Sequence, residues 1–131
     1  MKNLLYTLCL VGMLAACSPP DYGTLLHFNN GELYYTSQIT ESEAVRLGNF
    51  LVDDGFFYGG KVTVQIDKED NTYLFRMVTV EGTENDPTYL EEAAASTRVL
   101  SAEVFNGAPV DFHICDDRLQ TRKVVPYIAG P

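Results

Sequence analysis

Residues 61–78, KVTVQIDKEDNTYLFRMV, decide the fold that we expect for this chain. In the first part, Val62, Val64 and Ile66 alternate with polar residues, which is the period of a half-buried strand. Residues 68–71 are polar and favour a turn. After the turn, apolar residues recur at every second position, namely Tyr73, Phe75 and Met77. The segment therefore predicts a β-hairpin with one buried face.

A helix is predicted on each side of this hairpin. The first begins at Thr40, which has capping-box spacing with Glu43, and it ends at Gly55. One face of this helix carries four small or apolar residues, Ala44, Leu47, Gly48 and Leu51. The second helix begins at Asp86-Pro87 and stops at Asn106-Gly107. Its buried stripe comprises Leu90, Ala93, Ala94, Thr97, Leu100, Ser101 and Val104.

Further strands are expected near both ends of the chain. Residues 25–28 and 32–36 form a hairpin around the Asn-Gly turn at 29–31, and residues 110–115 and 119–125 form a last pair. Counting one strand before the first helix, we expect the order β-α-β-β-α-β-β, which is ferredoxin-like with an extra strand. The predicted fold class is α+β, a two-layer sandwich in which two helices cover one face of an antiparallel sheet.

The composition excludes several classes of function. The chain has 131 residues with 9 Lys and Arg against 18 Asp and Glu, which gives a formal net charge of −9. Nucleic-acid binding depends mainly on cationic side chains that neutralise phosphates, so we expect no nucleic-acid partner. With 46% hydrophobic residues the chain is expected to form a packed core, and its size is that of one domain.

The N-terminal segment carries the most specific motif in the chain. Lys2 is followed by an apolar run over residues 4–16, which is shorter than the ~20 residues that span a bilayer. The length fits a secretory signal peptide, with an uncleaved membrane anchor as the alternative. The run ends in Leu14-Ala15-Ala16-Cys17, which resembles the lipobox of bacterial lipoproteins.

This resemblance implies a lipidated protein of the bacterial cell envelope. Cys17 would receive a diacylglycerol thioether, cleavage would fall between Ala16 and Cys17, and further acylation, with palmitate for example, would make the anchor firm. Ser18 in place of Asp favours the outer membrane, facing the periplasm, in a Gram-negative cell. The expected organisation is a cleaved signal peptide over 1–16, a lipidated tether over 17–23 and one domain over 24–131. Apart from the covalent lipid we expect no cofactor.

Processing would also change the charge and the cysteine content. Removing residues 1–16, which contain Lys2 and no acidic residue, takes the net charge from −9 to −10. Cys9 leaves with the signal peptide and Cys17 carries lipid, so Cys115 is the one remaining free thiol. The folded part resembles a small bacterial domain without an assigned activity, through residues 32–36 and 110–117.

Residues 110–117 hold the strongest chemical candidates. His113 and Cys115 are two positions apart on a predicted strand, so they share a face with Asp111. Histidine, cysteine and carboxylate are ligands of zinc and copper, and His113, Cys115 and Asp116 are therefore an alternative metal-binding or redox site. The small number of ligands argues against a zinc site. A closed structural zinc site needs four ligands, and the chain has one further histidine, His27.

Enzymatic function is not favoured by the remaining patterns. Two side chains at i and i+2 of a strand are about 6.5–7 Å apart at Cα, too far for a Cys-His nucleophile without further movement. The acidic pairs lack the spacing of a calcium loop, and no nucleotide-binding or Ser-nucleophile motif is present. Tyr34-Tyr35 places one aromatic ring on the outer sheet face. We therefore expect a non-catalytic interaction module that binds an envelope protein or a second copy of itself, through the open sheet face or a sheet edge.

Overall fold

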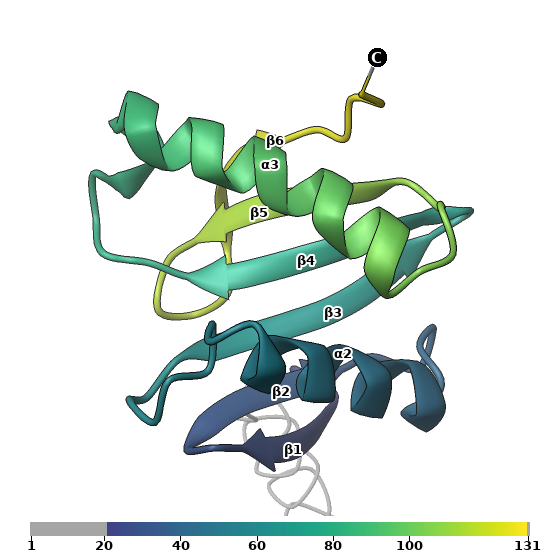
Figure 1. The fold of residues 1–131 in the computed structure, drawn as a ribbon. Coiled ribbons are helices and arrows are strands. Elements are labelled where there is room, and N and C mark those ends of the chain that lie inside the picture. Colours follow the sequence, from purple (N-terminus) through teal and green to yellow (C-terminus); the bar gives the residue numbers. More distant parts are fainter. Residues whose placement is uncertain (1–20, 131) are drawn as a thin grey trace, which may run out of the picture.

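Six strands lie side by side in one sheet, in the order in which they occur along the chain (Figure 1). The computed structural model describes residues 21–130, so the signal-peptide and lipobox predictions, including Ala16 and Cys17, lie outside the described residues. The strands are β1 (Thr24–Phe28), β2 (Gly31–Tyr35), β3 (Thr63–Glu69), β4 (Thr72–Val78), β5 (Val110–Cys115) and β6 (Thr121–Val125). The helices are α2 (Glu41–Asp53), the 3-10 turn η1 (Thr83–Asn85) and α3 (Pro87–Glu103).

The sheet is mixed, and this corrects the expected topology. Neighbouring strands β2 and β3 are parallel, as are β4 and β5, whereas the other three pairs are antiparallel. A helix joins the two strands of each parallel pair. Parallel strands start at the same end of the sheet, so the chain needs a crossover connection to return to that end. The ferredoxin-like antiparallel order was wrong for two reasons. The first hairpin contributes two strands rather than one, and each helix connects adjacent strands.

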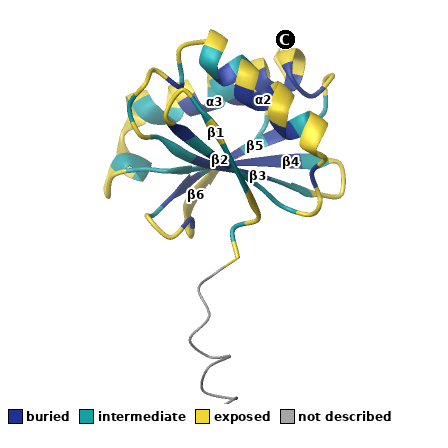
Figure 2. Ribbon diagram, turned by 90° about the horizontal axis from the view of Figure 1, so that it is seen from below, coloured by how far each residue is buried: buried dark blue, intermediate teal, exposed yellow. Residues whose placement is uncertain are grey.

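The α+β class and the two-layer arrangement are confirmed. Helix α2 lies over β2 and β3, and α3 lies over β4 and β5, so both helices cover the same face of the sheet (Figure 1; Figure 2). Within residues 21–130, no helix lies on the opposite face (Figure 2). No helix in residues 21–130 combines the length and the apolar character needed to cross a bilayer.

Both predicted helix starts are confirmed by their hydrogen bonds. The Thr40 hydroxyl accepts from the Glu43 backbone N–H, and the Glu43 carboxylate accepts from the Thr40 N–H, which completes the capping box. Asp86 caps α3 by accepting from the Thr88 N–H. The buried face of α2 is the predicted one, consisting of Ala44, Leu47, Gly48 and Leu51.

The core lies between the helices and the face of the sheet that they cover, which we call the covered face. The alternating residues of the central strands supply it, and Val64, Ile66 and Phe75 are at most 1% exposed. Gly48 lets α2 approach the sheet closely, because a Cβ there would lie 2.3 Å from the ring of Phe28. This face holds the main stabilising burial of the domain.

Candidate functional site: the open face of the sheet

The face of the sheet that the helices leave uncovered, which we call the open face, carries a continuous row of side chains across all six strands. The backbone register pairs each member of the row with the next. From β1 to β6 the row consists of Leu25, Tyr34, Gln65, Arg76, His113 and Val124. Its polar centre is unlike the apolar covered face, so the row needs its own hydrogen-bond partners.

Gln65 and Arg76 supply those partners at the centre of the row. Gln65 is only 5% exposed, and its Oε1 accepts a 2.6 Å hydrogen bond from the Arg76 guanidinium. Its Nε2 donates to the carbonyl oxygen of Tyr22 at 2.8 Å. The other terminal nitrogen of Arg76 donates to the Leu119 carbonyl and to the Thr121 hydroxyl. The pair therefore joins the start of the described chain to the loop between β5 and β6.

Residues 21–23 form a strap across the open face. Gly23 has a φ of +97°, and a Cβ there would lie 2.2 Å from the Tyr35 carbonyl oxygen, so this turn requires glycine. The Gly23 N–H donates to the Asp21 carboxylate at 2.9 Å. The Tyr22 ring packs edge-on against Tyr34, with 5.5 Å between the ring centroids. The described chain thus begins on the side of the sheet away from the helices (Figure 2).

A cleft of about 440 Å³ opens between this strap and the β5–β6 loop. We call it the open-face cleft; its lining residues are Tyr22, Glu32, Tyr34, Lys61, Val62, Thr63, Met77, Val78, Asp117 and Leu119. Glu32 accepts a 2.9 Å hydrogen bond from the Thr63 hydroxyl and lies 3.7 Å from the Lys61 ammonium. The cleft combines two tyrosines and aliphatic groups with a few charged groups, which is the usual character of a binding site.

His113 and Cys115 point to the open face as predicted, but they do not lie there in the same way. His113 is half-buried and its Nδ1 lies 2.9 Å from the Thr121 hydroxyl. Cys115 is fully buried, and its thiol donates toward the His113 backbone carbonyl at 3.5 Å. Burial raises the pKa of the Cys115 thiol, which keeps it protonated and unreactive at neutral pH.

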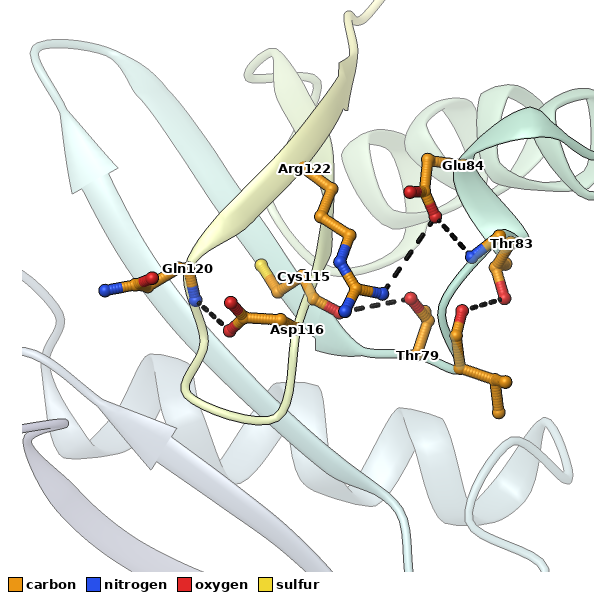
Figure 3. A network of polar contacts seen from close by, with 9 residues as sticks. Thr79, Thr83, Glu84, Cys115, Asp116, Gln120 and Arg122 are labelled. Atoms are coloured by element: carbon orange, nitrogen blue, oxygen red, sulfur yellow. Dashed lines mark hydrogen bonds and ion pairs between the residues drawn. The ribbon is translucent and has the colours of Figure 1, made fainter.

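Asp116 holds the turn that follows β5. Its carboxylate accepts from the backbone N–H of Gln120 at 2.9 Å (Figure 3). It also accepts from the backbone N–H of Arg118, at 2.9 Å. The hydrogen bond from Gln120 is the main reason why the pKa of Asp116 is lowered. The Cys115 carbonyl, in turn, accepts from the Thr79 hydroxyl at 3.1 Å. Within residues 21–130, no three His, Cys, Asp or Glu side chains are grouped so as to hold a metal ion.

A second cavity lies on the covered face, between the two helices. It has a volume of about 150 Å³ and is mainly apolar, with aromatic walls that include Phe50, Phe56, Phe75 and Phe112. It opens to the surface between the helices, so it is an apolar groove rather than an enclosed void. It contains no pair of titratable groups, so it offers no acid–base chemistry.

The sequence pattern identified the open face but missed the residues that organise it. One of Tyr34 and Tyr35 was predicted to lie on the outer face, and it is Tyr34 that lines the open-face cleft. Gln65 was expected only as a polar position of an alternating strand, and Arg76 was not singled out. Pairing the two strands around the turn at residues 70–71 would have placed them opposite each other. Leu119, which has a φ of +58°, folds over the open face and is buried there. No sequence pattern predicted this position of Leu119.

The fold and this surface define a small α+β domain with one helix-covered and one open sheet face. The model of the AF_1994_N family N-terminal domain matches residues 25–125, and the chain belongs to this family. The match extends from β1 to the end of β6, so it includes the complete sheet and both helices. Neither the comparison with curated proteins nor that with solved structures returned a match.

Proposed function

We propose that the protein is a lipid-anchored envelope lipoprotein whose domain is a non-catalytic module that binds another envelope protein. The observation that carries this proposal is the open-face cleft, which lies beside the strap where the chain enters the domain. Anchoring at Cys17 would raise the local concentration of this surface at a membrane, so a modest interface is sufficient. Tyrosine is enriched in protein interfaces, and Tyr22 and Tyr34 both line the cleft.

Catalysis has less support than binding in the described residues. The buried thiol of Cys115 has a raised pKa, whereas a nucleophilic cysteine needs a lowered one. Burial also lowers the pKa of His113, with a further contribution from the Arg76 charge, and the ring is held by Thr121 rather than by a carboxylate. Neither group is poised for acid–base or covalent chemistry.

Membrane fractionation of cells tests the anchor directly. Cys17→Ala should release the protein from the membranes or leave the uncut precursor, because the lipid attachment site is lost. Cys9→Ala and Cys115→Ser are the matched controls, since neither cysteine carries lipid in this proposal, and both should fractionate like the parent chain. An unchanged distribution of Cys17→Ala would contradict the lipoprotein assignment.

The alternative function is metal binding or redox chemistry at His113, Cys115 and Asp116, and metal analysis discriminates it. The chain purified at neutral pH should contain no stoichiometric zinc or copper if the interaction proposal is correct. A stoichiometric metal that disappears in Cys115→Ser would instead establish the alternative, because the thiolate would then be a ligand.

A further inference from the structure

The open face is acidic at the end opposite the cleft. Asp67 and Asp111 both pair in register with Leu74 from opposite sides, and Glu69 lies two residues beyond Asp67 on β3. The three carboxylates act to raise the pKa of His113, but burial and the Arg76 charge lower it more. We call Asp67, Glu69 and Asp111 the acidic end of the open face.

If Cys17 is lipidated as proposed, the strap determines the orientation of the open face relative to the membrane. Consecutive Cα atoms are at most about 3.8 Å apart, so the four steps from Cys17 to Asp21 span at most roughly 15 Å. The strap is bonded to Gln65 at the middle of the sheet, not to an edge. The open face must therefore lie close to the lipid headgroups, with the helices on the far side.

This position and charge restrict what can occupy the face. An anionic membrane surface is repelled by the acidic end, and a second copy of the chain would bring the same acidic end against it. Arg76 offsets only part of this charge, because its hydrogen-bond partners Gln65 and the Leu119 carbonyl are neutral and its single positive charge stands against three carboxylates. Charge complementarity instead favours a basic protein segment.

We propose that the open face binds an extended, basic segment of a partner protein at the membrane surface, with an apolar side chain of that segment in the open-face cleft and Lys or Arg side chains against Asp67, Glu69 and Asp111. The apolar side chain contacts Tyr34 and Leu119 in the cleft. To reach the acidic end, the segment passes over the strap, because Gln65 and Leu74, which lie between the cleft and the acidic end, are only 5% and 7% exposed.

The sheet also sets the spacing of such a segment. Thr63 lines the cleft, and Asp67 and Glu69 lie four and six residues further along the same strand. At about 3.3 Å per residue, these separations are roughly 13 and 20 Å. An extended partner running along β3 therefore places its basic residues four to six positions from its apolar residue.

Peptide binding to the full-length lipidated protein, held in nanodiscs of zwitterionic lipid, tests the proposal. The probe is a fluorescent peptide with one Leu and with Lys at the fourth and sixth positions after it, separated by Ser and Thr. One matched peptide has Gln in place of both Lys residues, and a second has Ala in place of Leu. Fluorescence anisotropy should show affinity at least about fivefold lower for both, because exposed charge pairs and one buried aliphatic side chain each contribute at that level.

Variants of the protein locate the binding surface. Glu69→Gln, which changes an exposed side chain at the end of β3, should weaken the Lys peptide about two- to fivefold and leave the Gln peptide unchanged. Tyr34→Ala should remove most of the dependence on Leu. Glu91→Gln on the exposed surface of α3 is the charge-matched control and should bind like the parent protein.

Three results would overturn the proposal. The first is equal binding of the Lys and Gln peptides, and the second is an affinity that neither Glu69→Gln nor Tyr34→Ala changes. The third is that the unlipidated protein binds vesicles containing anionic lipid, or dimerises, and that Tyr34→Ala abolishes this binding. Either result would show that a membrane or a second copy of the chain occupies the open face. Fractionation separates this proposal from the lipoprotein assignment. A protein that is membrane-bound but does not bind the Lys peptide contradicts only the peptide-binding proposal. A protein that binds the Lys peptide but is not membrane-bound contradicts only the lipoprotein assignment.

Discussion

The two faces of the sheet are built from alternate residues of the same strands, yet they are covered in different ways. On the covered face, Phe75 and Val64 pack under two capped helices and are fully buried. On the open face, Gln65 and Arg76 are covered only by the strap and by the β5–β6 loop, which they bind through hydrogen bonds. Apolar burial stabilises the first face, and polar pairing organises the second.

This difference separates stability from recognition. Non-directional burial of a large apolar area contributes most of the favourable free energy of folding. A polar network contributes little net stability, but it fixes the positions of the groups that it joins. The strap and the loop are the two walls of the open-face cleft, and the Gln65–Arg76 pair holds both. We therefore expect substitutions on the two faces to have separable effects.

The largest effect is expected from truncating the covered face. Phe75→Ala removes a ring that is 1% exposed, and it should lower the free energy of unfolding by about 3–5 kcal/mol. Val124→Ala, on the open face and 42% exposed, is the paired variant and should change it by less than about 1 kcal/mol. Urea unfolding followed by circular dichroism measures both. Similar losses for the two variants would remove the distinction between the faces.

Breaking the network at the centre of the open face should have an intermediate effect. Arg76→Met keeps the aliphatic stem but leaves Gln65 and the Leu119 carbonyl without their donor, which should cost about 1–3 kcal/mol. Hydrogen exchange should increase in residues 116–120 while the core of α2 stays protected. Arg46→Met, at an exposed position of α2, is the control. Unchanged exchange in the loop would show that Arg76 does not hold it.

The strap is tested by a substitution that its backbone does not tolerate. Gly23→Ala places a Cβ against the Tyr35 carbonyl at a positive φ, so the strap should detach at a cost of about 1–3 kcal/mol, the strain of such a conformation. Because few contacts are lost elsewhere, most of this cost should appear as local exchange at Tyr22 rather than as global unfolding. Gly55→Ala, where the added Cβ meets open space, shares the positive φ and controls for strain alone.

The smallest effect concerns pH and is carried by His113. Burial, followed by the Arg76 charge, lowers its pKa in the folded state below the usual 6.5, so the unfolded chain binds the proton more readily. This contribution to stability is present above pH 6.5 and is lost as the pH falls from there toward the lowered folded pKa. His113→Gln should flatten this part of the curve of unfolding free energy against pH. A curve with the same slope as the parent would contradict the assignment.

Local signals predicted the elements well and their arrangement only in part. The capping box at Thr40 and the Asp86-Pro87 start are encoded within a few residues, and both are confirmed. Whether a helix joins adjacent strands or strands separated by another is decided by packing across the whole sheet. This is why the parallel pairing of β2 with β3 was missed.

The candidate surface shows the same limit. The alternation of β5 correctly placed His113 and Cys115 on one face, but it did not predict that Cys115 is fully buried, with its thiol 3.9 Å from the Thr121 hydroxyl of β6. The strap was predicted only as an extended tether. Its contact with Gln65 joins residues 43 positions apart in the chain, and no local pattern encodes such a pairing.

The central claim is that the open face is the interaction surface, and site-specific photocrosslinking in the intact envelope tests it most directly. Val124 on the open face and Val99 on α3 are almost equally exposed, at 42% and 44%, and either can be replaced by a photoreactive residue. We expect a discrete crosslinked product from position 124, joined to a basic segment of a membrane-proximal protein, and none from position 99. Crosslinks from position 99 alone, or equally from both, would contradict the account.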